Sequence, residues 1–111
     1  MEAILAHVAR AQAPYQTNLL LAGYDDGVGA SLYWIDYLAT MHKMNIGGTG
    51  YGSYFVLSMF DKMWHPALTE AEAFEMMKKG VEEIKRRLVV SPSRFQVKVV
   101  DKNGIRDLGY L

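Results

Sequence analysis

The sequence predicts an α+β fold, because its helical and extended segments are clustered along the chain and do not alternate. Two strand-like segments lie in the first third, two helical segments follow each other in the middle, and two further strand-like segments come last. With 111 residues and 50% hydrophobic content, the chain can form one domain, residues 1–111, with its own core. It is too short for two domains.

The first third of the chain is predicted to hold a helix and a strand hairpin. Residues 3–11 place apolar side chains at helical spacing, and Pro14 ends that pattern. Residues 15–24 are typical of a strand, and their apolar run 19–22 lacks alternation, which predicts burial on both faces. Residues 25–29 contain the Asp and Gly types that tolerate positive φ, so we expect the next strand to return antiparallel.

An aromatic-rich strand, a short extended piece and a helix come next. The strand is expected at residues 31–37 and the extended piece at residues 40–45. Apolar side chains surround most of the circumference of residues 54–64, which predicts a deeply packed helix that ends before Pro66.

The last part of the chain begins with a helix-start signal. Residues 69–72, Thr-Glu-Ala-Glu, fit a capping box, and apolar side chains then recur at steps of three and four residues. The apolar members of this stripe are Phe74, Met77, Val81, Ile84 and Leu88. We therefore expect an amphipathic helix lying on a sheet. Residues 95–100 alternate as a half-buried strand, and a turn at residues 102–104 returns the chain through residues 105–108.

The composition excludes several classes of partner and site. Twelve basic and twelve acidic residues give a net charge of zero, so no overall field attracts nucleic acid or an anionic membrane. The absence of cysteine excludes disulfides, thiolate zinc sites and a cysteine nucleophile, and it favours an intracellular protein. The sequence shows neither a secretory signal nor a segment of transmembrane length.

A glycine-rich segment, residues 47–53, allows two interpretations, a phosphate cradle or close backbone packing. A dinucleotide fingerprint requires a third glycine where this chain has Ser53. A Walker loop requires a lysine at its end, and none follows Gly52. We therefore favour packing between a strand and a helix.

Other polar residues also have simpler structural explanations. His7, His42 and His65 are far apart in sequence and have no partner at metal-ligand spacing. The segment with Asp25 and Asp26 lacks the later acidic ligands of a calcium loop, and its composition predicts a hairpin turn. The composition of residues 101–104 also predicts a hairpin turn.

The serines and the basic run carry no clear chemistry either. No nucleophile elbow and no locally placed histidine accompany Ser31, Ser53, Ser58, Ser91 or Ser93. Residues 85–87, Lys-Arg-Arg, continue a charged helix face with Glu82 and Glu83, which indicates a solvated face or an interprotein salt-bridge site. We predict no catalytic, cofactor-binding or metal-binding residue.

Several segments occur together in a characteristic order and spacing. They are Pro14-Tyr15, residues 18–25, Tyr33 with residues 35–39, Gly50-Tyr51-Gly52, and residues 101–105. In this combination the chain resembles the eukaryotic proteasome beta-subunit family. The resemblance covers essentially the whole chain, but only about the C-terminal half of the family's usual chain.

This resemblance implies a fold. The family has a four-layer α-β-β-α sandwich of the N-terminal-nucleophile hydrolase type, and we expect the chain to form its C-terminal half. Residues 3–11 would then be the end of a central helix, and the chain a truncated form or a shortened gene model.

The resemblance also implies that the chain is not an enzyme. Active members use an N-terminal threonine supported by an aspartate and a lysine from early strands, whereas this chain starts with Met1 and lacks those segments. Active members place a serine where this chain has Tyr51, and their later aspartate falls near Leu88. Ser91 matches a serine of the same group, but alone it supports no mechanism.

The implied function is that of a non-catalytic structural subunit of the 20S proteasome core beta ring, which supports assembly and ubiquitin-dependent protein degradation. Its expected partners are other proteasome alpha and beta subunits, in the cytoplasm and nucleus. No cofactor, nucleic acid or membrane is expected. The alternative is an independent small α+β protein-interaction module.

Overall fold

The computed structural model describes residues 18–111, and the predicted helix at residues 3–11 lies outside them. The order of elements is β1 (Leu19–Asp25), β2 (Gly29–Ile35), β3 (Met41–Met44), α2 (Ser53–Met63), α3 (Glu70–Arg87), β4 (Gln96–Asp101) and β5 (Gly104–Tyr110). A mixed α and β fold is therefore confirmed, with each of these elements at its predicted place. The largest difference in bounds is at the start of β1, because the strand was predicted from residue 15 and begins at Leu19. The β2 strand begins and ends two residues before its predicted bounds.

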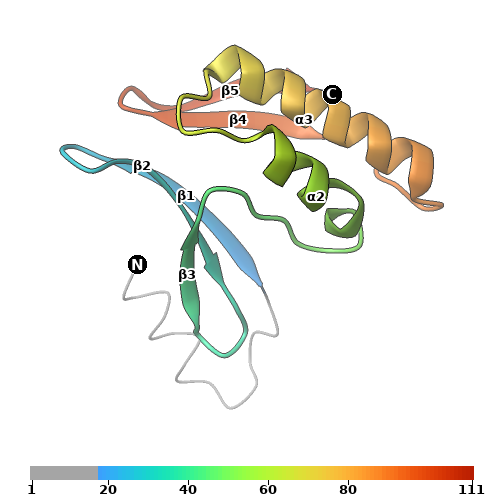
Figure 1. Cartoon of the computed structure of the whole chain (residues 1–111), viewed down its shortest axis with the longest axis horizontal. Coiled ribbons are helices and arrows are strands. Elements are labelled where there is room, and N and C mark those ends of the chain that lie inside the picture. Colours follow the sequence, from blue (N-terminus) through green and yellow to red (C-terminus); the bar gives the residue numbers. More distant parts are fainter. Residues whose placement is uncertain (1–17) are drawn as a thin grey trace.

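The strands form two separate antiparallel sheets. The first has the order β1-β2-β3, with Leu19 opposite Ile35 and Leu32 opposite Met44. The second is the β4-β5 hairpin, with Asp101 opposite Gly104. Figure 1 shows β4 and β5 running alongside α3, while the three-stranded sheet extends away from the helices.

Two of the three hairpin turns were predicted from composition. At the β1-β2 turn the amide of Val28 donates to the Asp25 carbonyl at 3.1 Å, and Gly27 takes a φ of 82°. At the β4-β5 turn the amide of Asn103 donates to the Asp101 carboxylate at 2.8 Å, and Gly104 has a φ of 96°. Positive φ is costly for most residues but not for glycine, which explains why these residue types terminate the strands.

The β2-β3 turn was not predicted, and it corrects the strand expected to continue to Tyr37. The Asp36 carboxylate accepts the amides of Leu38 at 2.9 Å and Thr40 at 2.8 Å. These bonds offer the backbone an alternative to the strand ladder. They also hold Ala39 at a φ of 62°, the only positive value for a non-glycine residue within residues 18–111.

The two helices pack against each other and hold the main core. Val56, Phe60 and Met76 are buried there, and five partly buried apolar residues surround them, namely Ile46, Met59, Met63, Leu68 and Ile84. The predicted capping box of α3 is confirmed, because the Thr69 amide donates to the Glu72 carboxylate at 2.8 Å and the Glu72 amide donates to the Thr69 hydroxyl at 3.3 Å. The bond from the Thr69 amide is the main cause that lowers the pKa of Glu72.

The buried faces of the helices differ from the predicted ones. In α2 only Val56 and Phe60 are buried, whereas Tyr54 is 82% exposed, so the helix is packed on one face only. In α3 the buried residues are Met76, Gly80 and Val81, whereas Met77 of the predicted stripe is 44% exposed. The reason is that α3 packs against α2 through Gly80, a position that the apolar periodicity does not mark.

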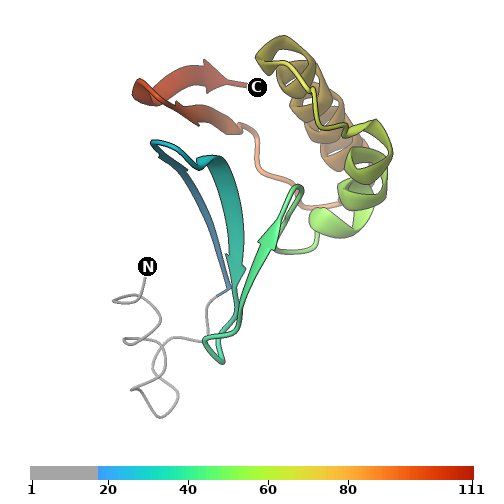
Figure 2. The same ribbon diagram turned by 60° about the vertical axis from the view of Figure 1, so that its left-hand side comes forward.

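An ion-pair cluster links α3 to the β4-β5 hairpin. The Arg106 guanidinium in β5 lies 2.7 Å from the Glu70 carboxylate and 2.8 Å from the Asp101 carboxylate. The bond to Glu70, with that to Asp101, raises the pKa of Arg106 above its ordinary value. Figure 2 shows the helices on one side and the strands on the other, as expected for a helix lying on a sheet.

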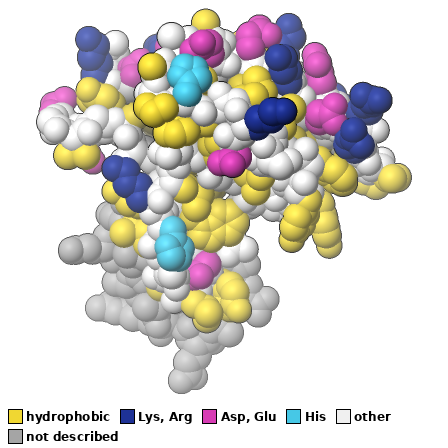
Figure 3. All heavy atoms as spheres, viewed as in Figure 1, with side chains coloured by type: hydrophobic (Ala, Val, Ile, Leu, Met, Phe, Trp, Pro, Cys, Tyr) yellow, Lys and Arg dark blue, Asp and Glu magenta, His cyan; other side chains and the backbone are white. Residues whose placement is uncertain are grey.

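The described part of the chain buries little apolar surface. Only Ile35, Val56, Phe60, Met76 and Val81 are buried hydrophobic residues within it. In contrast, sixteen large hydrophobic residues of the described part are exposed. Figure 3 shows apolar side chains at the surface over the three-stranded sheet and beneath the helices.

The predicted burial of residues 19–22 on both faces is therefore wrong within residues 18–111. Leu19 is 39% exposed and Leu20 is 38% exposed. No element among residues 18–111 forms a complete layer on either face of β1. The missing alternation thus indicates apolar surface that residues 18–111 do not cover.

The contact between Gly80 and Phe60 provides a test of the helix packing. A Cβ atom on Gly80 would lie 2.5 Å from Phe60 Cζ. Gly80→Ala gains about 1 kcal/mol in helix propensity but overpacks a site where such changes cost roughly 1–3 kcal/mol. We expect net destabilisation and faster amide exchange in α2 and α3, by about fivefold, measured by hydrogen-deuterium exchange mass spectrometry.

The double variant Phe60→Leu/Gly80→Ala is the matched control, since it removes the clashing ring. It should restore much of the protection lost in the single variant. Slower exchange in Gly80→Ala than in the parent chain would contradict close packing at this contact.

Candidate functional site

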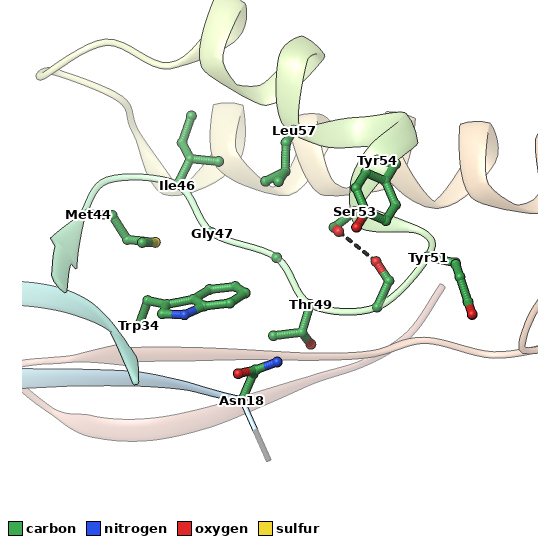
Figure 4. A pocket seen from close by; sticks show the side chains of 12 residues that line it. Asn18, Trp34, Met44, Ile46, Gly47, Thr49, Tyr51, Ser53, Tyr54 and Leu57 are labelled. Atoms are coloured by element: carbon green, nitrogen blue, oxygen red, sulfur yellow. Dashed lines mark hydrogen bonds between the residues drawn. The ribbon is translucent and has the colours of Figure 1, made fainter. Parts of the chain in front are cut away.

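The glycine-rich segment borders an open hollow of about 500 Å³ between the three-stranded sheet and α2 (Figure 4). Its wall consists of Trp34 from β2, Met44 from β3, Leu57 from α2, and the connecting segment between β3 and α2. The lining residues are Asn18, Trp34, Met44, Ile46, Gly47, Gly48, Thr49, Gly50, Tyr51, Ser53, Tyr54 and Leu57. None of these described side chains is charged.

Three glycines of the segment lie in close contact with neighbouring side chains. A Cβ atom on Gly47 would lie 2.7 Å from both Leu20 Cδ2 and Met44 Sδ. One on Gly48 would lie 2.9 Å from Ser53 Cβ, and one on Gly52 would lie 3.2 Å from Ile84 Cδ1. The backbone therefore approaches β1, β3 and both helices so closely that a larger residue at these positions requires the neighbouring side chains to shift.

The hydrogen bonds at the start of α2 argue against a phosphate cradle. The amides of residues 53, 54 and 55 donate to the carbonyls of residues 50, 51 and 52 at 3.1 to 3.2 Å. A phosphate site at a helix start needs such amides to be free. The Ser53 hydroxyl also donates to the Gly50 carbonyl at 2.6 Å, so it is held by its own turn. The geometry supports the packing interpretation.

The histidines are not brought together. His42 lies on β3 opposite Trp34, while His65 lies between the helices with its Nε2 atom 3.6 Å from the Glu72 carboxylate. His7 lies outside the described residues. Residues 18–111 contain no group of three His, Asp or Glu side chains that could hold a metal ion.

The other polar candidates also have structural roles or separate positions. Asp25 and Asp26 form the β1-β2 turn. The serines are scattered, with Ser31 on β2, Ser58 on α2, and Ser91 and Ser93 after α3. At the basic run, Arg87 lies 2.6 Å from Glu83 and lowers the pKa of that carboxyl group, and Arg86 is 76% exposed. This run is a solvated face within the chain.

Tyr51 and Leu88, the two positions singled out by the resemblance, form no catalytic group. Tyr51 lies at the edge of the hollow and is 80% exposed (Figure 4). Leu88 is the residue that caps the end of α3. The sequence did not reveal that Trp34 and Met44 face the glycine segment, because that contact depends on strand register. No helix within the described residues is long and apolar enough to cross a membrane.

Comparisons with known proteins point to one family. A model of the proteasome subunit family matches residues 2–100. Proteasome subunit beta type-2 of Oryza sativa subsp. japonica is 54% identical over 94 residues, which are 85% of this chain and 44% of the relative. Proteasome subunit beta type-2-A of Arabidopsis thaliana is 52% identical over 97 residues, which are 87% of this chain and 48% of the relative.

A more distant relative gives the same result. Probable proteasome subunit beta type-4 of Schizosaccharomyces pombe is 44% identical over 105 residues, 94% of this chain and 54% of the relative. The chain thus spans about half the length of the curated relatives it matches.

Gly50 offers a clean test of the glycine turn, because a Cβ atom there would meet nothing within 4 Å. Its φ of 78° is the only obstacle to substitution. Gly50→Ala should cost about 1–2 kcal/mol and speed amide exchange at the start of α2. Gly50→Asn should cost less, since asparagine tolerates this conformation better. Equal exchange rates for both variants and the parent chain would contradict the assigned turn.

Proposed function

Because the chain belongs to the proteasome beta-subunit family, we propose that it is a non-catalytic structural subunit of the 20S proteasome core beta ring. In this role it contributes to assembly and to the chamber wall, and thereby supports ubiquitin-dependent protein degradation. It works together with other alpha and beta subunits in the cytoplasm and nucleus. The names of the matched relatives support the placement in the proteasome.

The proposed fold is the C-terminal half of a four-layer α-β-β-α sandwich, formed by residues 1–111 as one unit. Two features support it. The strands are divided between two separate sheets, and the helices lie on one side of them. Both arrangements are expected when strands from two stacked sheets and one outer helix layer are present.

The observation that carries the proposal is the large uncovered apolar surface. Among residues 18–111, only five hydrophobic residues are buried, whereas sixteen large hydrophobic residues are exposed. A stable protein interface requires about 800 Å² on each partner. Apolar side chains that remain at the surface of β1, including Leu19 and Leu20, are available for such contacts. Exposed apolar surface of this kind is expected in a subunit whose neighbours cover that surface.

The non-catalytic part of the proposal is supported by the glycine segment. Tyr51 occupies the position at which, by resemblance, active members have a serine, and its side chain points to solvent. The nearby Ser53 hydroxyl is bonded to its own turn. Neither residue is arranged as a nucleophile with a base.

The first test is the size of the chain under native conditions in cells that contain proteasomes. A tagged chain should co-migrate with a particle of several hundred kilodaltons and co-purify with alpha and beta subunits. Leu19→Glu, which places a charge on the uncovered face, should reduce this fraction. Val28→Glu is the matched control, since Val28 is 70% exposed at a turn. A soluble, stable monomer outside the particle would instead support the independent interaction module.

A second test addresses catalysis. An electrophilic peptide probe that reacts with N-terminal threonines should label catalytic subunits of the same purified particle and leave this chain unlabelled. The two are separated by mass after denaturation, so the catalytic subunits serve as an internal control. Labelling of this chain would overturn the non-catalytic assignment.

A further inference from the structure

The tip of the β4-β5 hairpin carries the dipeptide Asn103-Gly104, at the outer end of that sheet (Figure 1). Both residues are exposed in the described part of the chain, and a Cβ atom on Gly104 would meet nothing within 4 Å. Gly104 itself takes a φ of 96°. Open space therefore lies beside the peptide group that joins the two residues.

An asparagine that precedes glycine can react with the backbone that follows it, and asparagine is accordingly a thermolabile residue. The backbone nitrogen of Gly104 attacks Asn103 Cγ, which forms an N–C bond and breaks the bond from Cγ to Nδ2. Nδ2 leaves as ammonia and takes up the amide proton of Gly104. Water then opens the cyclic imide at either of its two carbonyl carbons, which gives aspartate or isoaspartate. Apart from this water the reaction is intramolecular, so it needs no enzyme, oxidant or cofactor.

Among the three asparagines of the sequence, only Asn103 is followed by glycine. Asn45 is also exposed, but it precedes the β-branched Ile46, whose side chain hinders an attack by its own backbone nitrogen. Asn18 precedes Leu19, which also carries a side chain. Glycine has no side chain, and its backbone adopts conformations that other residues avoid. Asn45 thus matches Asn103 in exposure but not in ease of attack.

The fold gives the β4-β5 turn little protection against this reaction. Ring closure requires the turn to rearrange briefly, at the cost of a local opening. The β4-β5 sheet has only two strands, and such hairpins are marginally stable by themselves. A register shift between Val97 and Lys98 further interrupts its ladder. The tip therefore opens at a small cost in free energy, and the folded chain remains reactive.

We propose that Asn103-Gly104 is a site of spontaneous deamidation in the folded chain, and that its isoaspartate product loosens the β4-β5 hairpin from α3. This chemistry needs only the chain and water, so it does not depend on the proposed function. In isoaspartate the main chain runs through Cβ and Cγ, which lengthens the turn by one carbon atom. The original backbone carboxyl group of residue 103 becomes a free carboxylate in the same turn.

The Asp101 carboxylate connects this change to α3. It accepts the Asn103 amide at 2.8 Å, and this bond is the main cause that lowers the pKa of Asp101, so Asp101 is charged at neutral pH. It also lies 2.8 Å from the Arg106 guanidinium, which lies 2.7 Å from Glu70 at the start of α3. A new carboxylate at residue 103 repels Asp101 and competes with it for Arg106. The ion pairs between the hairpin and α3 are then weakened.

The reaction is tested by incubating the full chain at neutral and mildly alkaline pH in water labelled with heavy oxygen. Acid digestion with pepsin then stops the reaction, and mass spectrometry locates the labelled oxygen. Residue 103 should gain it at a rate within about tenfold of the rate in denaturant, because turn tips open at little cost. The rate should rise with pH, since the attacking amide must lose its proton.

Asn45 is the internal control for exposure, and it should react more slowly than Asn103 by about tenfold or more. Asn103→Gln is the non-reactive variant, because its ring would contain one more atom and closes far more slowly. It should gain no labelled oxygen at residue 103. If residue 103 of the folded chain reacts no faster than Asn45, the proposed site is wrong.

The loosening of the hairpin is measured on chain that contains isoaspartate, identified by enzymatic methylation of its free carboxylate. Hydrogen exchange at the start of α3 should be faster than in the unreacted chain by up to about fivefold, as expected for the loss of exposed ion pairs. Asn103→Asp adds the charge without lengthening the main chain and should have a smaller effect.

Arg106→Gln shows whether the effect passes through the ion pairs. This variant lacks them from the outset, so isoaspartate at residue 103 should cause no further acceleration at the start of α3. Equal exchange there in reacted and unreacted parent chain would overturn the proposed loosening. An equally large acceleration in the Arg106→Gln background would overturn the route through Asp101 and Arg106.

Discussion

The close approach of α3 to α2 at Gly80 is the constraint on which the rest of the described structure depends. Because Gly80 has no side chain, the Phe60 ring occupies the space of a Cβ atom and the main core closes between the helices. Ile84, one turn further along α3, then contacts Gly52 at the start of α2. In this way the helix pair determines where the glycine segment runs and where the hollow beside Trp34 forms. It also gives α3 the fixed position from which Glu70 reaches Arg106 of the second sheet.

Local signals in the sequence predicted much of this fold, because their physical causes are local. The capping box and the Asp-Gly and Asn-Gly turns involve neighbouring residues, and the structure has them at the predicted places. The β2-β3 turn was not predicted because the composition around it is typical of a strand. The turn depends on the Asp36 carboxylate, which accepts two backbone amides. The burial of α3 was mispredicted because a glycine contributes nothing to apolar periodicity even where it is buried.

The candidate site shows a different limit of prediction. The sequence correctly favoured packing for the glycine segment, since the motifs that bind phosphate were incomplete. Two of the contacts, Leu20 with Gly47 and Ile84 with Gly52, join residues that are distant in sequence and could not be assigned without strand register and helix packing. The same reason explains why the hollow was not predicted. The failed expectation for residues 19–22 shows that an apolar run without alternation can remain at the surface of residues 18–111.

The division of five strands between two unconnected sheets affects how long a copy of this chain can survive without partners. Within residues 18–111, β1 and β3 are edges of one sheet, and both strands of the β4-β5 hairpin are edges of the other. Unpaired edges beside apolar surface are templates for strand addition between identical molecules. If the chain acts as the proposed ring subunit, a copy without partners can be captured by them or can aggregate with identical copies. In that case the rate at which copies aggregate depends on how soon a partner covers these edges.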